Sequence, residues 1–189
     1  VNGDNPADRL LWSNPDFQLI KSLIAVLCPA VISTKTFWSQ EVFENGSRLL
    51  QALAWQVGSE VSYNELSKTV GIDKETVVNY IDLLEKSFVV YRLNPLSEMT
   101  EGDLYLKEIY FYDNGIRNAI INNFNPIGQR NDIGALWENY FITEKLKFNS
   151  YQKLPVKSWF WLSKMHAEID YVEEGRDGIS AFELKWNEK

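Results

Sequence analysis

Residues 168–172, EIDYV, and residues 179–186, ISAFELKW, are two strand-like segments that decide the fold we predict for this chain. The side chains of a strand alternate between its two faces. Alternation therefore puts Glu183 and Lys185 side by side on one face of the second strand. If the two strands are neighbours in a sheet, Asp170 of the first strand lies beside that pair. The sequence thus predicts two acids and one amine gathered on a sheet.

A long helix is predicted just before these strands, from residue 131 or 132 to about residue 148, and a first strand is predicted at residues 159–162. Glu138 lies one turn from Phe141 and Ile142, so it points toward the apolar side of this helix. A carboxylate on that side has to be paired, protonated or associated with a metal, because an unpaired buried charge costs several kcal/mol. Glu138 is therefore a fourth candidate for the same site.

These four residues suit metal-dependent phosphodiester cleavage. Asp170 and Glu183 would supply the oxygen ligands that Mg²⁺ prefers, and the ion would activate a water molecule and neutralise charge on a phosphoryl oxygen. Lys185 would orient that water or stabilise the transition state, and Glu138 would act through water. The candidate catalytic residues are therefore Glu138, Asp170, Glu183 and Lys185, with Asp170 and Glu183 as the hypothetical Mg²⁺ ligands.

A structural explanation competes with this hypothesis. An acid-x-lysine pair is common on exposed strands, where Glu183 and Lys185 would form a modest ion pair. A nuclease-like fold would not by itself establish cleavage either. His166 and Cys28 are the only histidine and cysteine, so neither a zinc site nor a catalytic Cys-His pair is predicted. His166 is expected on the surface, with a proton-shuttle role as the alternative.

The middle of the chain, residues 47–129, predicts a winged helix-turn-helix. Ser47, Ser62 and Asp73 are N-cap candidates for three successive short helices, and Ser62 forms a capping box with Glu65. Strands are predicted to follow at residues 88–93 and 104–112, and Asp113 is predicted to cap a further helix. Three helices followed by a two-stranded ribbon are typical of a winged helix-turn-helix. The loop at residues 122–129, with Pro126 and Gly128, is the predicted domain boundary.

Contact with DNA would be made by the third of these helices. Its outward basic and amide candidates for nucleic-acid binding are Lys74, Asn79 and Lys86. The same helix carries three acids, Glu75, Asp82 and Glu85, and acids repel phosphate. A winged helix that serves as a structural or protein-binding module is therefore the favoured alternative.

Residues 1–46 form a helical segment whose affiliation the sequence leaves open. Apolar residues recur at helical spacing from residue 17 to residue 27, and Pro29 ends that helix. The chain starts at Val1 within a loop-like sequence, so we expect it to be a fragment of a longer protein.

Bulk composition narrows the class of protein. The formal net charge is −7 and the pI is about 4.8. This acidic balance argues against strong sequence-independent binding of nucleic acid. Residues 130–189 hold 9 basic and 10 acidic side chains, so nucleic-acid binding is less disfavoured there. The sequence has no signal peptide, and its most apolar stretch is too short to span a membrane. A single cysteine favours a reducing compartment, so a cytoplasmic location is expected.

Several short motifs together resemble one family. They are SYNEL (62–66), TVVNYIDLLE (76–85), KEIYFYDNG (107–115), GALWEN (134–139), EIDY (168–171) and FELK (182–185). This combination resembles the C-terminal region of prokaryotic AAA-type ATPases that end in domain of unknown function 4143. The order of a helix acid, a strand acid and an acid-x-lysine strand is also similar to that of restriction-endonuclease-like phosphodiesterases. The resemblance implies a winged helix followed by a nuclease-like domain, and it matches Glu138, Asp170, Glu183 and Lys185 to the acidic and lysine positions of that domain.

The predicted fold class is therefore α+β: a helical segment at 1–46, a winged helix-turn-helix at 47–129, and an α/β restriction-endonuclease-like (PD-(D/E)XK) domain at 130–189 that is incomplete at its C-terminus. The sequence has no phosphate loop, so ATP would be bound by an N-terminal ATPase domain that this chain lacks. The expected function is a nucleic-acid-associated ATPase module, with metal-dependent cleavage left open. The alternative is a catalytically inactive module that binds a protein partner or a second copy of the chain.

Overall fold

The computed structural model describes residues 40–96, 107–163 and 167–186. The predicted helix at residues 17–27, the first part of the strand predicted at residues 104–112 and His166 lie outside these residues. The described elements are, in chain order, α3 (Gln40–Trp55), β1 (Glu60–Val61), α4 (Tyr63–Val70), α5 (Lys74–Lys86), β2 (Val90–Pro95), β3 (Lys107–Phe111), α6 (Asn114–Ile120), the 3-10 helix η2 (Ile127–Gln129), α7 (Ile133–Tyr151), β4 (Lys157–Leu162), β5 (Glu168–Gly175) and β6 (Gly178–Phe182).

Local capping signals place the short helices. The Ser62 hydroxyl accepts a hydrogen bond from the backbone N–H of Glu65 at 3.4 Å and begins α4. Asp73 accepts one from Thr76 N–H at 2.8 Å and begins α5. Gly71 ends α4 with φ of +79°, a left-handed conformation that glycine adopts without steric cost. Asp113 likewise caps α6. These predicted caps are confirmed.

The prediction that Ser47 caps a helix is wrong. The helix α3 already includes Gln40, so Ser47 lies inside it. The sequence Asn45-Gly46 reads as a helix breaker by propensity, but the helix continues through it because its neighbours pack there. Gly46 lies against the ring of Tyr80 from α5, and Arg48 donates to the side chain of Asn45. Tertiary packing overrides the weak local preference.

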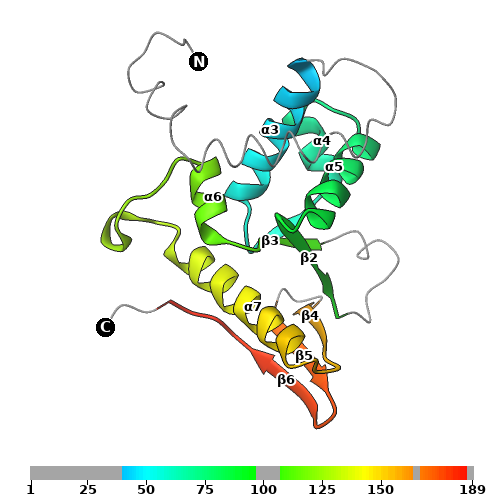
Figure 1. Cartoon of the computed structure of the whole chain (residues 1–189), viewed down its shortest axis with the longest axis vertical. Helices are drawn as coiled ribbons and strands as arrows, with labels where there is room; N and C mark the ends of the chain where they lie inside the picture. The colour runs from blue at the N-terminus through cyan, green and yellow to red at the C-terminus, as the bar shows by residue number, and fades with distance from the viewer. Residues whose placement is uncertain (1–39, 97–106, 164–166, 187–189) are drawn as a thin grey trace.

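One mixed sheet runs through the described part of the chain, in the strand order β1-β3-β2-β4-β5-β6. The strands β1, β3 and β2 pair antiparallel, and β4, β5 and β6 also pair antiparallel. The two groups are joined where β2 and β4 pair in parallel, with Asn94 opposite Trp159. Figure 1 shows α3, α4 and α5 gathered at one end of the molecule and α7 lying along β4–β6 at the other. The mixed α+β class is confirmed.

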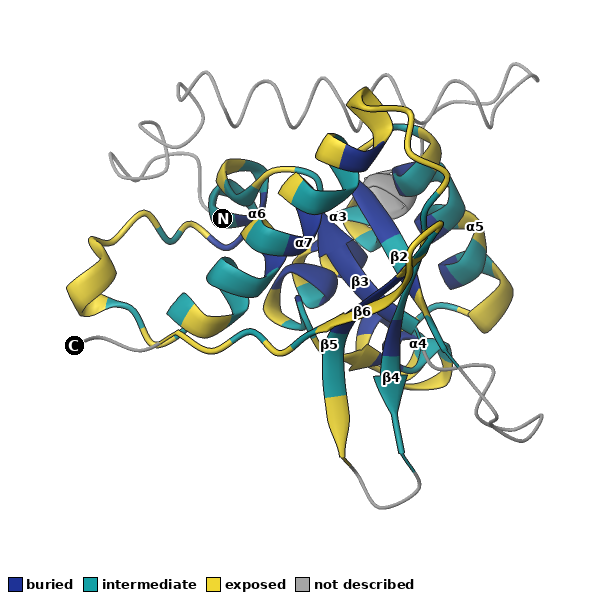
Figure 2. Cartoon of the chain, turned by 90° about the horizontal axis from the view of Figure 1, so that it is seen from below, coloured by how far each residue is buried: buried dark blue, intermediate teal, exposed yellow. Residues whose placement is uncertain are grey.

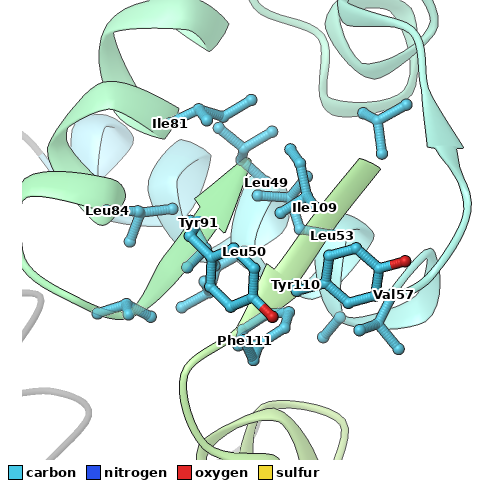
Figure 3. Packing of buried hydrophobic residues seen from close by; sticks show 14 of the residues in the cluster. Leu49, Leu50, Leu53, Val57, Ile81, Leu84, Tyr91, Ile109, Tyr110 and Phe111 are labelled. Atoms are coloured by element: carbon cyan, nitrogen blue, oxygen red, sulfur yellow. The ribbon is translucent and has the colours of Figure 1, made fainter. Parts of the chain in front are cut away.

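The main core lies where α3, α4 and α5 pack on β2 and β3. Its fully buried members include Leu49, Leu53, Val77, Ile81 and Ile109. Figure 2 shows this buried interior continuing under α7. Figure 3 shows Tyr91, Tyr110 and Phe111 of β2 and β3 packed beside Leu50 and Val57. The core therefore includes the strand residues that α7 covers.

The strand predicted at residues 179–186 is shorter than expected. The last pair in its ladder joins Tyr171 to Phe182, so Glu183 and Lys185 follow β6 in a segment without regular structure. The prediction that these two residues lie on a strand face is wrong. The ladder ends here because the carboxylate of Asp170, rather than a backbone carbonyl, accepts the hydrogen bond from Leu184 N–H.

Strand β5 contains a bulge that the alternation argument did not foresee. Trp159 and Trp161 of β4 are two residues apart, but their partners Val172 and Ile169 are three apart. Two residues of β5, Asp170 and Tyr171, therefore stand opposite the single residue Phe160. A bulge interrupts the two-residue alternation and re-aims side chains. Simple alternation along the strand predicted at residues 168–172 puts Glu168, Asp170 and Val172 on one face, and the bulge breaks that face between Asp170 and Val172.

The predicted boundary between residues 129 and 130 falls in an exposed segment that includes η2. The sheet nevertheless continues across it through the β2–β4 pairing, so the two halves share one sheet. Among the described helices, none is long and apolar enough to cross a membrane.

Candidate functional site

Helix α7 is fastened to β3 by buried polar contacts. The hydroxyl oxygen of Tyr110 on β3 lies 2.7 Å from Oε1 of Glu138 on α7. The same oxygen lies 2.8 Å from Oε2 of Glu108, two residues earlier on β3. The side chains of Glu108 and Tyr110 are buried, with at most 1% of their surface exposed. The predicted candidate Glu138 thus contacts a tyrosine of the predicted winged-helix segment and is linked through it to a second acid.

The carboxyl groups of Glu108 and Glu138 have pKa values well above the ordinary carboxyl range. Burial raises the pKa of Glu108 to about 9, and nearby Glu138, Glu168 and Asp170 add to the increase. Burial raises the pKa of Glu138 to about 7, again with contributions from Asp170 and Glu168. A buried carboxyl prefers its neutral form because the low-dielectric interior disfavours charge. Glu108 is therefore protonated at neutral pH.

Two acids from β5 complete the set. The pKa values of Glu168 and Asp170 are raised, first by burial, and for Glu168 next by the charge of Asp170. We refer to Glu108, Glu138, Glu168 and Asp170 as the acidic cluster. Its members come from β3, α7 and β5, and the bulge in β5 lies at Asp170. Glu168 is itself exposed, so its pKa is raised less by burial than those of Glu108 and Glu138. Carboxyl groups with raised pKa values that gather from distant parts of a chain mark a candidate functional site.

The predicted acid-x-lysine pair lies at the edge of this cluster. Lys185 and Glu183 contact each other at 2.5 Å, with their side chains 78% and 60% exposed. The charges of both residues act on Asp170. The structure therefore brings Glu138 and Asp170 within electrostatic range and places Glu183 and Lys185 beside Asp170. The amine of Lys185 is engaged by Glu183.

A Mg²⁺ ion was the expected cofactor of these residues. One oxygen of Asp170 accepts from Leu184 N–H and one oxygen of Glu138 is bonded to Tyr110. Within the three described ranges, no group of three or more His, Cys, Asp or Glu side chains is placed so that it could hold a metal ion. As the described side chains lie, they do not form a metal centre.

The second candidate surface is the exposed side of α5. Lys74, Asn79 and Lys86 are all exposed there, as contact with nucleic acid would require. Arg92 on β2 approaches two acids of this helix, with its guanidinium 2.7 Å from Asp82 and in a salt bridge with Glu85. Two of the three acids that were expected to repel phosphate are therefore paired with one arginine of the fold, which offsets one of their two negative charges.

A buried ionic group anchors the start of α7. Asp132 forms salt bridges with Arg117 of α6 and with Arg130, whose side chains are 2% and 3% exposed. Arg117 also donates to the backbone carbonyl of Ala54 at 2.8 Å. These two hydrogen-bonded arginines hold the pKa of Asp132 well below its usual range. The contacts tie α3, α6 and α7 together.

Sequence reasoning missed Glu108 and Tyr110, and it gave Glu168 no role. One signal was available in the sequence. Glu108 directly precedes the apolar run Ile109-Tyr110-Phe111 in the same predicted strand, and a charge in a buried strand needs a partner. The missing information was that Glu138, distant in sequence, supplies the other end of the contact.

Comparison with known proteins divides the chain into two segments. Residues 133–189 match the model of a domain of unknown function (DUF4143), and residues 39–126 match that of another domain of unknown function (DUF8612). The uncharacterized protein MJ1637 of Methanocaldococcus jannaschii is 26% identical over 102 residues, which cover 54% of this chain and 22% of that protein. The chain thus spans about a fifth of this relative's length. No solved structure matches the chain. The C-terminal segment, with Glu138, Asp170, Glu183 and Lys185, is therefore similar to the DUF4143 family.

Proposed function

We propose that this chain is the nucleic-acid-associated C-terminal module of a prokaryotic AAA-type ATPase, in which a winged helix precedes a restriction-endonuclease-like unit. The order α3-β1-α4-α5-β2-β3, with β3 between β1 and β2, supports the winged helix. The order α7-β4-β5-β6, with an acid on α7 and another on β5, supports the nuclease-like unit. ATP would be bound by a domain outside this chain.

The observation that carries the nucleic-acid part is the position of Arg92. By pairing with both Asp82 and Glu85, its single positive charge offsets one of their two negative charges on the helix that would approach the duplex. The exposed polar side of α5 then presents Lys74, Asn79 and Lys86 with Glu75 as the remaining acid. Phosphate contacts by lysine supply the sequence-independent part of nucleic-acid affinity.

A salt titration of duplex-DNA affinity tests this part. If α5 contacts phosphates, the logarithm of the binding constant falls linearly with the logarithm of salt concentration. Lys86→Glu should weaken binding and reduce that slope by about one. Lys153→Glu is the matched control, because Lys153 is an equally exposed lysine beyond the end of α7. Equal effects of the two substitutions would contradict a role for α5.

A second candidate is a catalytically inactive module that docks the ATPase onto a protein partner. This candidate is favoured because three of the candidate catalytic side chains are already engaged in contacts within the protein. Glu138 is bonded to Tyr110, Asp170 to the backbone of Leu184, and Lys185 to Glu183. Each group is thus held by the protein itself.

A nicking assay separates the two candidates. The chain is incubated with plasmid DNA and Mg²⁺ or Mn²⁺, in parallel with Asp170→Ala and with Asp177→Ala, which alters an exposed acid in the β5–β6 turn. Nicking by the wild type and by Asp177→Ala that Asp170→Ala loses supports metal-dependent cleavage. Absence of nicking in all three, together with absence of salt-dependent DNA binding, supports the catalytically inactive module that docks onto a protein partner.

A further inference from the structure

The contact between Glu108, Tyr110 and Glu138 requires one more proton than the tyrosine supplies. The phenolic oxygen lies 2.8 Å from one carboxyl oxygen and 2.7 Å from another. Both separations are hydrogen-bond distances between oxygens, and each needs a proton between its two atoms. A phenol has a single O–H. If both carboxyl groups were ionised, one contact would bring two oxygen lone pairs together inside the protein.

The additional proton belongs on Glu108. This residue is 1% exposed, whereas Glu138 is less deeply buried, and the cost of a charge increases with burial. As a neutral acid, Glu108 donates to the Tyr110 oxygen, and Tyr110 donates to the carboxylate of Glu138. All three side chains are then satisfied.

The surrounding charges favour retention of this proton. Glu60 lies opposite Glu108 in the β1–β3 ladder, and Glu168 and Asp170 face the same group from β5. Glu183 and Lys185 lie beside Asp170 on the segment after β6 and are paired with each other. Lys107, next to Glu108 in sequence, donates to Asn94 at 2.6 Å. Tyr91, stacked on Tyr110, is uncharged. The groups acting most strongly on Glu108 after its burial and its bond to Tyr110 are acids, which disfavour a further negative charge.

The contact lies at the joint between the two halves of the chain. Glu138 also lies under the backbone of Gly58, where an added Cβ would meet its Oε1 at 2.8 Å. Five residues later on α7, the hydroxyl of Thr143 donates to the Phe111 carbonyl at 3.1 Å and accepts a 2.9 Å hydrogen bond from the Tyr91 hydroxyl. The segment after α3, the strands β2 and β3, and α7 therefore meet around one shared group.

We propose that Glu108, Tyr110 and Glu138 share one proton in addition to the phenol's own, and that this proton fastens α7 to β3. Loss of the proton at alkaline pH leaves two facing oxygens without a hydrogen between them and loosens the joint between the two halves. The inference goes beyond the proposed function, because it does not depend on binding of nucleic acid.

Hydrogen exchange of the whole chain tests the proposal. The reporter is the amide of Phe111, which donates to Asn139 of α7 at 2.7 Å. After correction for intrinsic exchange, its protection should fall roughly tenfold for each pH unit between about pH 7 and 9, the factor expected for one linked proton. The amide of Ile81 in α5, away from the joint, is the control and should change less steeply.

Glu108→Gln removes the titration and keeps a donor, because the side-chain amide can donate to the Tyr110 oxygen. In this variant the pH dependence at Phe111 should be lost, whereas Glu168→Gln should retain it. Infrared spectra of the wild type at neutral pH should show the carbonyl band of a protonated carboxylic acid, and raising the pH should remove it. Absence of that band at neutral pH, or pH-independent protection at Phe111 in the wild type, would overturn the proposal even if a variant failed to fold.

Discussion

The side-chain amide of Asn139 on α7 bonds to both backbone polar groups of Phe111 on β3. Phe111 N–H donates to Oδ1 of Asn139 at 2.7 Å, and Nδ2 of Asn139 donates to the carbonyl of Phe111 at 2.9 Å. Asn139 thus takes the place of a neighbouring strand at the end of β3. Both residues are buried, so water cannot replace these bonds. The relationship explains how a helix is docked on a sheet in one register.

Replacement of Asn139 by alanine should destabilise the fold by about 1–3 kcal/mol, because it leaves the buried Phe111 N–H without a partner. The Phe111 carbonyl loses one of two donors and keeps the Thr143 hydroxyl at 3.1 Å. Chemical denaturation followed by circular dichroism measures the change. Asn125→Ala, at an exposed loop position, is the control and should stay within about 0.5 kcal/mol of the wild type. Similar values for both variants would show that Asn139 does not hold α7 in place.

Two glycines with similar backbone conformations offer a matched pair. Gly58 and Gly71 have φ of +69° and +79°, but an added Cβ would meet Glu138 Oε1 at 2.8 Å at Gly58 and nothing within 4 Å at Gly71. Gly71→Ala should cost about 1–2 kcal/mol, from the left-handed backbone alone. Gly58→Ala should cost about 1–3 kcal/mol more, because Glu138 has to move. Thermal unfolding of the two variants measures the difference, and equal losses would contradict the close approach of Glu138.

Asp132 is the shared salt-bridge partner of two buried arginines, so Asp132→Asn should lower the free energy of unfolding by about 3–5 kcal/mol. The substitution keeps the shape of the side chain but leaves the guanidinium groups of Arg117 and Arg130 without a counter-charge. Urea titration measures the loss. Glu144→Gln, which removes an exposed pair with Lys147, should cost less than about 1 kcal/mol. A loss at Asp132 no larger than that at Glu144 would refute the anchoring role.

Stability should fall as the pH rises from about 5 to 9. In the folded protein the pKa of Glu108 is raised to about 9 and that of Glu138 to about 7, so the folded state binds more protons than the unfolded chain over this range. The stabilising contribution is complete below the ordinary carboxyl pKa and is lost as the pH rises through the raised values. The loss should reach several kcal/mol, because one pKa unit corresponds to about 1.4 kcal/mol. Denaturation curves at a series of pH values check the slope. Glu108→Gln should flatten it, and a slope that is unchanged in this variant would assign the effect to other groups.

Local signals in the sequence predicted much of the fold. Ser62, Asp73 and Asp113 each satisfy backbone N–H groups within three residues, so their effect can be recognised without tertiary information. The prediction that Ser47 begins a helix was wrong because the true start of α3 depends on a contact that is distant in sequence. The helix passes through Asn45 and Gly46 because Tyr80, more than thirty residues later, packs against Gly46, and no local pattern reports that contact.

The candidate site was predictable only in part. Helical spacing placed Glu138 on the inner side of α7, where the structure has it, and Glu138 lies close enough to Asp170 for that carboxylate to raise its pKa. The bulge at Asp170 and the end of β6 before Glu183 depend on pairing between strands, which a two-residue alternation cannot foresee. Glu108 and Tyr110 escaped notice because their significance depends on a partner almost thirty residues away.

The most direct test of the central claim is a titration of the isotope-labelled chain with duplex DNA, followed by backbone amide chemical shifts. Association of nucleic acid through α5 predicts that the largest shifts fall in residues 74–86, and that residues 178–182 of β6 remain unchanged. Shifts confined to β6 and the outer side of α7, or no shifts at salt concentrations low enough for phosphate contacts to form, would contradict it.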